Sequence, residues 1–340
     1  MKMAAKKILK LNEKPLIYGR LHHAYPLSII TSHEETMPWF FSNFIQLSCL
    51  KNIHPQNTLD MNFLWDDGRF YLNSCPWINY LDIPEPFFNH CIQKNIVDFI
   101  ISTIDTEGYI YLHVDEFYIP EKYSYQKRSY PHCNFIFGYN KDEKVFYTLG
   151  YDSLERFKII QTTFSDLEKS FTNCPPDFRL DVLYFIGQGS TYDFDFDLIR
   201  GYIQDYLSSQ NSLVKFKTQT NHIYEDKNCV FGMAVYNQLK VYLSSLIEEK
   251  AELDVRNLHI LWEHKVVMKE RFMFMKANFK GDFSNYIKCY EEIENKALIQ
   301  RCKFLKYSLS KKTKEIISIL KGLEEMKDAE EQLLTSFLNS

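Results

Sequence analysis

The sequence changes character near residue 200, and this change constrains the fold more than any other feature. Before it, apolar and aromatic segments of strand length are broken by Pro, Gly and Asn. After it, long stretches of helical periodicity are joined by short linkers, which favours antiparallel packing. The pattern predicts an α+β chain, with a helix-plus-antiparallel-sheet domain over residues 15–195 and an α-helical domain over residues 196–340. The long helices are expected at 228–250, 254–278, 284–309 and 311–337.

Composition and charge exclude several protein classes. The net charge is −4, with nearly balanced basic and acidic residues, which argues against a nucleic-acid-binding or anionic-membrane surface. The sequence contains no run of about 18 apolar residues, so no transmembrane helix is expected. The N-terminus lacks the features of a signal peptide. Eight cysteines without a CxxC pair indicate a reducing compartment. The adjacent His22 and His23 lack a carboxylate at helical spacing that could complete a metal site with them. A cytoplasmic protein without a bound metal is expected.

The C-terminal helical region is expected to bury apolar stripes and to expose charged faces. Met268, Phe272, Met275 and Phe279 follow helical spacing and are expected in the core. The many lysines alternate with glutamates, which predicts solvated helix faces rather than an anion-binding stripe. A homodimer through this helical domain is one further option.

The segment YPHCNFIFGYNKDEKVFYTLGYD, residues 130–152, carries the clearest chemical pattern. His132 stands at the start of an expected strand over 133–140, KDEK forms a turn, and a second strand over 145–152 ends at Asp152. Because the outer ends of two antiparallel strands lie side by side, His132 and Asp152 are expected near each other at a sheet edge. A carboxylate in that position orients a general-base imidazole and stabilises its protonated form.

This segment, together with HVDEFYIP upstream, resembles compact bacterial papain-like cysteine peptidases. The similar families are the bacteriocin-leader peptidases and the butirosin biosynthesis protein H N-terminal family, over roughly residues 15–190. The resemblance implies a papain-like fold and a Cys-His-Asp site, with His132 as base and Asp152 as its orienting carboxylate. For the butirosin-type branch it implies transfer of an acyl or peptidyl group from a carrier-protein thioester to an amine, forming an amide. The phosphopantetheine arm of an acyl or peptidyl carrier protein then serves as substrate carrier, and no other cofactor is expected.

The nucleophile position departs from the family pattern. A sequence of the type Cys-x-Pro-x-Ser opens the first helix in these families, and here Pro26 and Ser28 match, whereas Ala24 occupies the Cys position. Alanine has no nucleophilic atom, so covalent catalysis at this position is excluded. The chain is then an inactive form, an enzyme with another nucleophile, or a non-catalytic module that binds a carrier protein or peptide. The alternative nucleophiles are Ser28, Cys49, Cys75 and Cys133.

Three side chains are expected to contact the substrate. Tyr25 and Ser28 follow the nucleophile position, and Tyr130 ends a Tyr-rich loop over 118–130 that precedes His132. Lys122, and the basic residues at 127 and 128, are expected at the mouth of an apolar channel. There they would suit the phosphopantetheine arm of an acidic carrier protein. A leader-peptide protease is a third option, weakened by the absence of a transporter segment.

Overall fold

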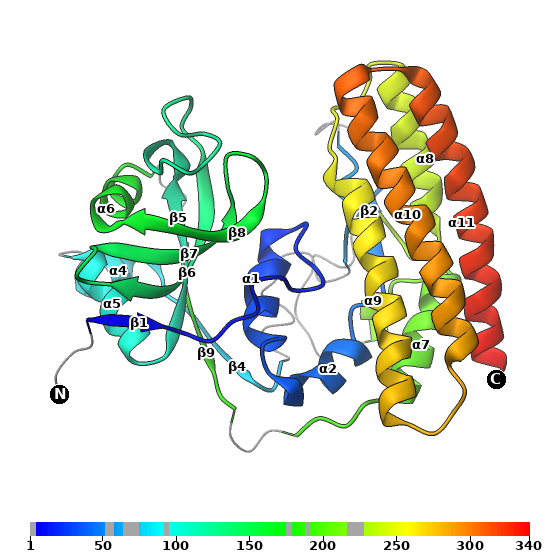
Figure 1. Ribbon diagram of the computed structural model, residues 1–340, viewed down its shortest axis with the longest axis horizontal. Helices are drawn as coiled ribbons and strands as arrows, with labels where there is room; N and C mark the ends of the chain where they lie inside the picture. Colours follow the sequence, from blue (N-terminus) through cyan, green and yellow to red (C-terminus); the bar gives the residue numbers. More distant parts are fainter. Residues whose placement is uncertain are drawn as a thin grey trace. The chain divides into compact units, whose positions relative to one another are not determined.

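The computed structural model describes residues 5–51, 58–63, 75–91, 95–174, 179–187, 191–215 and 228–340 (Figure 1). The chain forms an N-terminal region of antiparallel sheet with helices, followed by a helical C-terminal region, as the α+β prediction requires. It divides into two compact units, which we call the sheet unit and the helical unit. The sheet unit comprises Met1–Met37 and Tyr71–Tyr192, and the helical unit comprises Pro38–Phe70 and Asp193–Ser340.

The division between the units differs from a single cut at residue 195. The boundary between Tyr192 and Asp193 lies close to that position. The earlier segment Pro38–Phe70, however, also belongs to the helical unit. The buried guanidinium of Arg271 explains part of this, since its Nε donates to the Phe41 carbonyl at 2.7 Å. Strand pairing explains more, because β2 (Leu47–Leu50) lies between β10 (Cys229–Phe231) and β3 (Asn62–Phe63) in a small antiparallel sheet.

The sheet unit is built on a seven-stranded sheet in which every described strand pair is antiparallel. The strand order is β4-β9-β5-β6-β7-β8, and β1 also pairs with β6. The two strands predicted around residues 133–152 are present as β6 and β7, with a β-bulge near Gly138. A Cβ at Gly138 would lie 2.9 Å from the Lys7 carbonyl oxygen, so glycine lets β1 approach there. The strands are β1 (Lys6–Ile8), β4 (Ile78–Asp82), β5 (Gly108–Asp115), β6 (Pro131–Asn140), β7 (Val145–Tyr151), β8 (Phe157–Thr163) and β9 (Leu180–Phe185).

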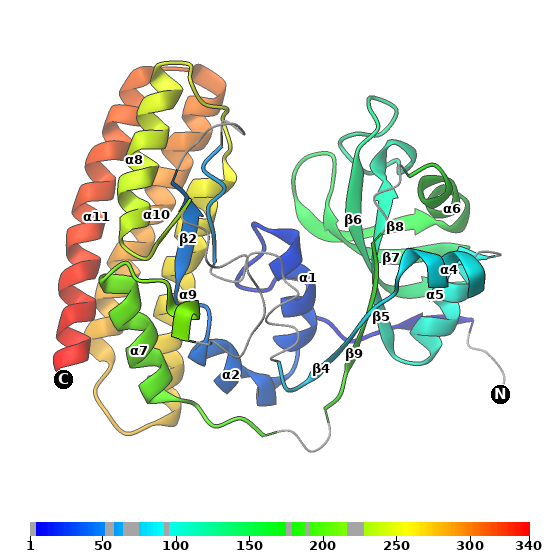
Figure 2. The same cartoon turned by 180° about the vertical axis from the view of Figure 1, so that it is seen from behind.

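Helices cover both faces of this sheet. The helix α1 lies on the opposite side of the sheet from α5 and α6 (Figures 1 and 2). Local sequence sets the helix starts: the Asn95 side chain accepts from the Asp98 amide before α5, and Thr163 accepts from the Asp166 amide before α6. The helices are α1 (Leu21–Ile30), α4 (Glu85–Cys91), α5 (Ile96–Asp105) and α6 (Phe164–Thr172), with 3₁₀ turns at Glu34–Thr36 and Glu116–Tyr118.

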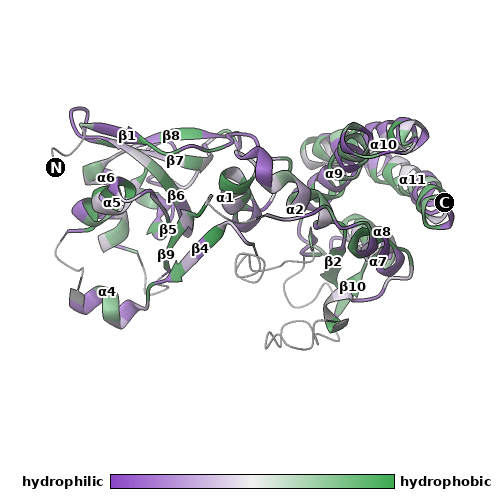
Figure 3. Ribbon diagram, turned by 90° about the horizontal axis from the view of Figure 1, so that it is seen from below, coloured by the Kyte–Doolittle hydropathy of each residue, from purple (hydrophilic) through white to green (hydrophobic). Residues whose placement is uncertain are grey.

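The helical unit is a bundle in which α9, α10 and α11 pack in sequence and α11 also packs on α7 and α8. Of the predicted stripe, Met268, Phe272 and Met275 are buried. Phe279 is only half-buried, because α9 ends at Asn278 and the backbone of Phe279 is extended. Hydrophilic and hydrophobic residues alternate along α10 and α11 (Figure 3), which is typical of helices with one face in a core. No helix in the described ranges is long and apolar enough to cross a membrane. The helices are α2 (Met37–Ser42), α7 (Phe196–Leu207), α8 (Ala234–Ile247), α9 (Arg256–Asn278), α10 (Ser284–Ser310) and α11 (Thr313–Asn339), with a 3₁₀ turn at Ser212–Lys215.

A fully buried ion pair lies in the core of the helical unit. Lys265 on α9 donates to both carboxylate oxygens of Glu330 on α11, at 2.7 and 2.6 Å, and both side chains have no exposed surface. Tyr206 and Tyr236 donate to Oε2 of Glu330 at 3.0 and 2.9 Å, and Tyr290 donates to Oε1 at 3.1 Å. Burial lowers the pKa of Lys265, and Glu330 opposes that shift. The network therefore satisfies two charges that burial alone would make unfavourable.

Candidate functional site

The start of α1 lies against the start of β6. The ring of Tyr25 stacks on Phe135, with centroids 5.1 Å apart, and its hydroxyl donates to the Cys133 carbonyl oxygen at 3.2 Å. Burial raises the pKa of Tyr25, so this hydroxyl stays protonated. Ala24 precedes it, fully buried, with its amide donating to the Arg20 carbonyl at 2.9 Å. The segment around Ala24 therefore lies over the strand that carries His132.

The imidazole of His132 contacts a buried carboxylate. Its Nδ1 lies 3.0 Å from Oε1 of Glu116, whose side chain is 8% exposed, whereas that of His132 is 35% exposed. Strand pairing causes this contact: β5 and β6 are antiparallel with Val114 opposite His132, so the end of β5 delivers Glu116 to the start of β6. With Nδ1 donating to the carboxylate, Nε2 is the atom that can accept a proton.

Two further polar groups gather at the same place. Nζ of Lys122 lies 3.4 Å from Oε1 of Glu116, and the lysine is buried rather than at the mouth of a channel. Burial raises the pKa of Glu116, but the His132 hydrogen bond and the Lys122 charge outweigh it and bring the pKa below its usual value. A Cβ at Gly150 would lie 3.1 Å from the Tyr25 hydroxyl and 3.2 Å from Lys122 Nζ. Glycine thus lets these polar groups approach the backbone of β7.

Asp152 follows β7 as predicted, but its carboxylate is engaged elsewhere. Its Oδ2 accepts from Nε and Nη2 of Arg156 at 2.9 and 2.7 Å, and Nζ of Lys158 lies 3.6 Å away. Its Oδ1 accepts from the backbone amides of Leu154 and Arg156. Glu116, and not Asp152, is therefore the carboxylate that contacts the imidazole. The carboxylate of Asp152 is taken up locally, because an Asp side chain readily accepts hydrogen bonds from backbone amides of its own turn.

The Asp152 turn should make the protein sensitive to acid. Burial raises the pKa of Asp152, but hydrogen bonds from Arg156 and nearby backbone amides lower it far more, so the net shift is downward. A carboxyl with a lowered folded-state pKa contributes stability above its unfolded pKa of about 3.9 and loses it as pH falls further. We expect the melting temperature of the wild type to fall more steeply below about pH 4 than that of Asp152→Asn. Parallel slopes in thermal melts at pH 7, 4 and 3 would contradict this.

The alternative nucleophiles lie in unsuitable environments. Ser28 is fully buried, and its hydroxyl donates to the Ala24 carbonyl at 2.7 Å, a bond within α1. Cys49 belongs to the helical unit, and burial raises the pKa of its thiol. Burial also raises the pKa of Cys75 to about 12, so both thiols stay protonated near neutral pH. Cys133 follows His132 on β6, and neighbouring strand residues point to opposite faces.

Tyr130 lies next to the imidazole of His132. Its ring centroid lies 5.0 Å from that of His132, the guanidinium of Arg128 lies 5.2 Å from the Tyr130 ring, and the tyrosine is 38% exposed. Asp115 holds this loop, because its carboxylate accepts from the Tyr130 amide at 2.8 Å and from the Ser129 hydroxyl at 2.6 Å. An exposed aromatic ring is thus fixed beside the imidazole, where a bound molecule would meet it.

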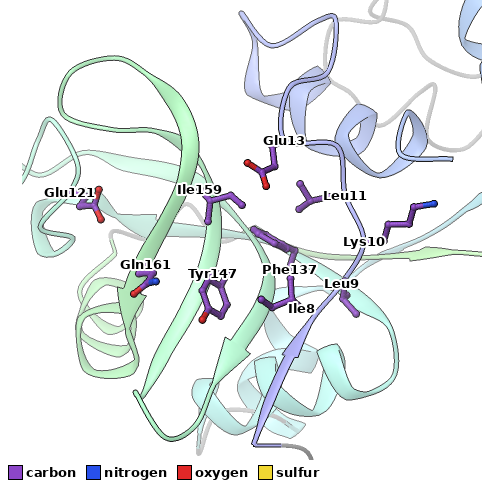
Figure 4. Close-up of a pocket in the computed structure, with 10 residues that line it drawn as sticks. All are labelled: Ile8, Leu9, Lys10, Leu11, Glu13, Glu121, Phe137, Tyr147, Ile159 and Gln161. Atoms are coloured by element: carbon purple, nitrogen blue, oxygen red, sulfur yellow. The ribbon is translucent and has the colours of Figure 1, made fainter.

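A cavity of about 690 Å³ opens on the sheet face that also carries α1 (Figure 4). The two share a face because Phe135, on which Tyr25 stacks, pairs with Leu149, and Leu149 pairs with the cavity residue Ile159. The volume is typical of a small-molecule site. Most lining side chains are apolar, with charged and amide groups at the rim: Ile8, Leu9, Lys10, Leu11, Glu13, Glu121, Phe137, Tyr147, Ile159 and Gln161.

Over the described ranges, no group of three His, Cys, Asp or Glu side chains is arranged to hold a metal ion. No family model matches the sequence, and a comparison with curated proteins finds no match.

Proposed function

We propose that the sheet unit has a papain-like fold and that the chain is a carrier-protein-dependent acyl or peptidyl transferase that forms amides. The observation that carries this proposal is the 3.0 Å contact between His132 Nδ1 and the buried carboxylate of Glu116. It provides an oriented base at the start of a strand, beside the helix that aligns with the family nucleophile.

In the proposed reaction the acyl group passes directly to the amine, without an acyl-enzyme. The amine nitrogen attacks the thioester carbonyl, and Nε2 of His132 takes the proton that this nitrogen loses. The C–N bond forms, the C–S bond breaks, and the departing thiolate takes the proton from the imidazolium. The products are an amide and the free thiol of the phosphopantetheine arm. Glu116 keeps the imidazole in the required tautomer and stabilises its charged form.

A non-catalytic module is the second candidate. Ala24 favours it, because this fully buried side chain has no atom that can form an acyl-enzyme. Such a module would bind a carrier protein or peptide at the surface around His132. It would leave the thioester intact.

Acyl-pantetheine thioesters mixed with a panel of primary amines distinguish the two candidates. We expect the wild type to form amide and His132→Ala to lose roughly 10²- to 10⁴-fold in rate, as is usual when a general base is removed. His90→Ala, on the exposed side of α4, is the matched control and should retain full activity. Thiol release and mass-detected amide are the two readouts.

Ala24→Cys completes this test. Amide formation by Ala24→Cys but not by the wild type would support the non-catalytic module and contradict direct transfer. Amide formation by neither protein, with correct folding confirmed by circular dichroism, would overturn the transferase assignment.

A further inference from the structure

An exposed apolar stripe runs along the C-terminal half of α10. Ile299, Leu305 and Leu309 are 50%, 37% and 89% exposed, and Cys302 between them is also exposed. These positions are spaced by three, three and four residues, so they lie on one helix face over about 15 Å. Ile317 on the neighbouring helix α11 is also exposed, at 60%. Single exposed apolar residues are common, whereas an aligned group of this kind marks an interaction surface.

The same region carries a strong positive charge. Residues 299–321 contain seven basic residues and one acidic residue, in a chain whose net charge is −4. The acidic residue, Glu315, is already paired with Lys306 at 3.0 Å. We call the stripe and its cations the basic–apolar patch. The exposed basic residues of the patch are Lys306, Lys311, Lys312, Lys314 and Lys321. Arg301 donates to His259 on α9, and Lys303 donates to Ser318 on α11.

We infer that the basic–apolar patch binds an acidic amphipathic helix of a partner protein. A stripe one helix wide, bordered by cations, is complementary to a helix with an apolar stripe bordered by carboxylates. A second copy fits less well, because self-pairing of the patch would bring its lysines together. A membrane fits less well because the stripe lacks the aromatic residues typical of interfacial helices. The inference does not depend on the transferase activity.

The probe is a synthetic 18-residue helix with leucines at positions i, i+3 and i+7 and glutamates on both flanks. We expect it to bind the full chain in fluorescence anisotropy and to weaken several-fold between 50 and 300 mM salt, as Debye screening requires. Leu309→Glu should weaken binding at least tenfold, and Lys312→Glu with Lys314→Glu should weaken it and reduce its salt dependence. Bound peptide should also slow alkylation of Cys302.

Lys288→Glu is the control, because it reverses a charge on the exposed N-terminal half of α10, outside the patch. It should leave peptide binding unchanged. Equal loss in Lys288→Glu, or unchanged binding in Leu309→Glu, would overturn the inference. A dimer mass in light scattering that Leu309→Glu converts to monomer would assign the patch to a second copy. Binding to phosphatidylglycerol vesicles without binding to the peptide would assign it to a lipid surface.

Discussion

Replacing Glu330 with Gln is expected to lower the free energy of unfolding of the helical unit by about 3–5 kcal/mol. The substitution leaves the ammonium of Lys265 fully buried without its counter-charge, and two of its hydrogen bonds, at 2.6 and 2.7 Å, end on the altered group. Removing one partner of a buried pair costs more than the pair itself contributes, because the remaining charge is still desolvated. Urea unfolding followed by circular dichroism at the helical band measures the loss.

Two control variants separate the buried charge from other effects. Lys265→Met with Glu330→Gln removes both charges and keeps an amide oxygen as acceptor for the tyrosine hydroxyls, so this double variant should be more stable than Glu330→Gln alone. Glu324→Gln makes the same change on α11 in an exposed pair with Lys240 and should cost less than about 1 kcal/mol. Additive losses in the double variant, or equal losses at the two glutamates, would contradict a coupled buried pair.

Only part of this core was predictable from the sequence. Glu330 falls on the helical repeat of buried α11 positions that includes Leu323, Met326 and Leu334, so its burial has a readable signal. The partners of Glu330 could not be predicted from the sequence, because Lys265 lies on another helix and helical spacing does not say which helices pack together. The basic–apolar patch was also not predicted from the sequence, because the charge pattern was judged over too long a segment. Lysines alternate with glutamates over the C-terminal third as a whole, but residues 299–321 depart from that average.

The candidate site was also predictable only in part. Strand and turn patterns predicted β6, β7 and the place of His132, because these depend on local sequence. Which carboxylate meets the imidazole depends on side-chain competition that spacing does not describe. Glu116 lies in the HVDEFYIP segment, but only the pairing of β5 with β6 brings it to His132. Asp152 matched the family pattern, yet its own turn and Arg156 take up its carboxylate.

Glu116→Gln is expected to lower kcat of amide formation roughly 10²- to 10⁴-fold with little change in KM. The amide can hold Nδ1 only by accepting a hydrogen bond from it through the oxygen or by donating one to it through the nitrogen. The second arrangement fixes the wrong tautomer, and neither supplies the negative charge that stabilises the imidazolium. Near neutral pH the wild-type carboxyl is ionised, since the His132 bond and Lys122 outweigh burial and lower the pKa of Glu116. The measurement is initial rate against amine concentration.

Asp152→Asn is the matched variant, because it makes the same carboxylate-to-amide change at the position that the family pattern assigns. It should retain kcat within about threefold and differ chiefly in acid stability, because its contacts are with Arg156 and the turn backbone. A larger loss of kcat in Asp152→Asn than in Glu116→Gln would return the orienting role to Asp152. It would also mean that the side chains rearrange around His132 when substrate binds. Partial recovery in Glu116→Asp would indicate that charge, more than exact reach, supports the base.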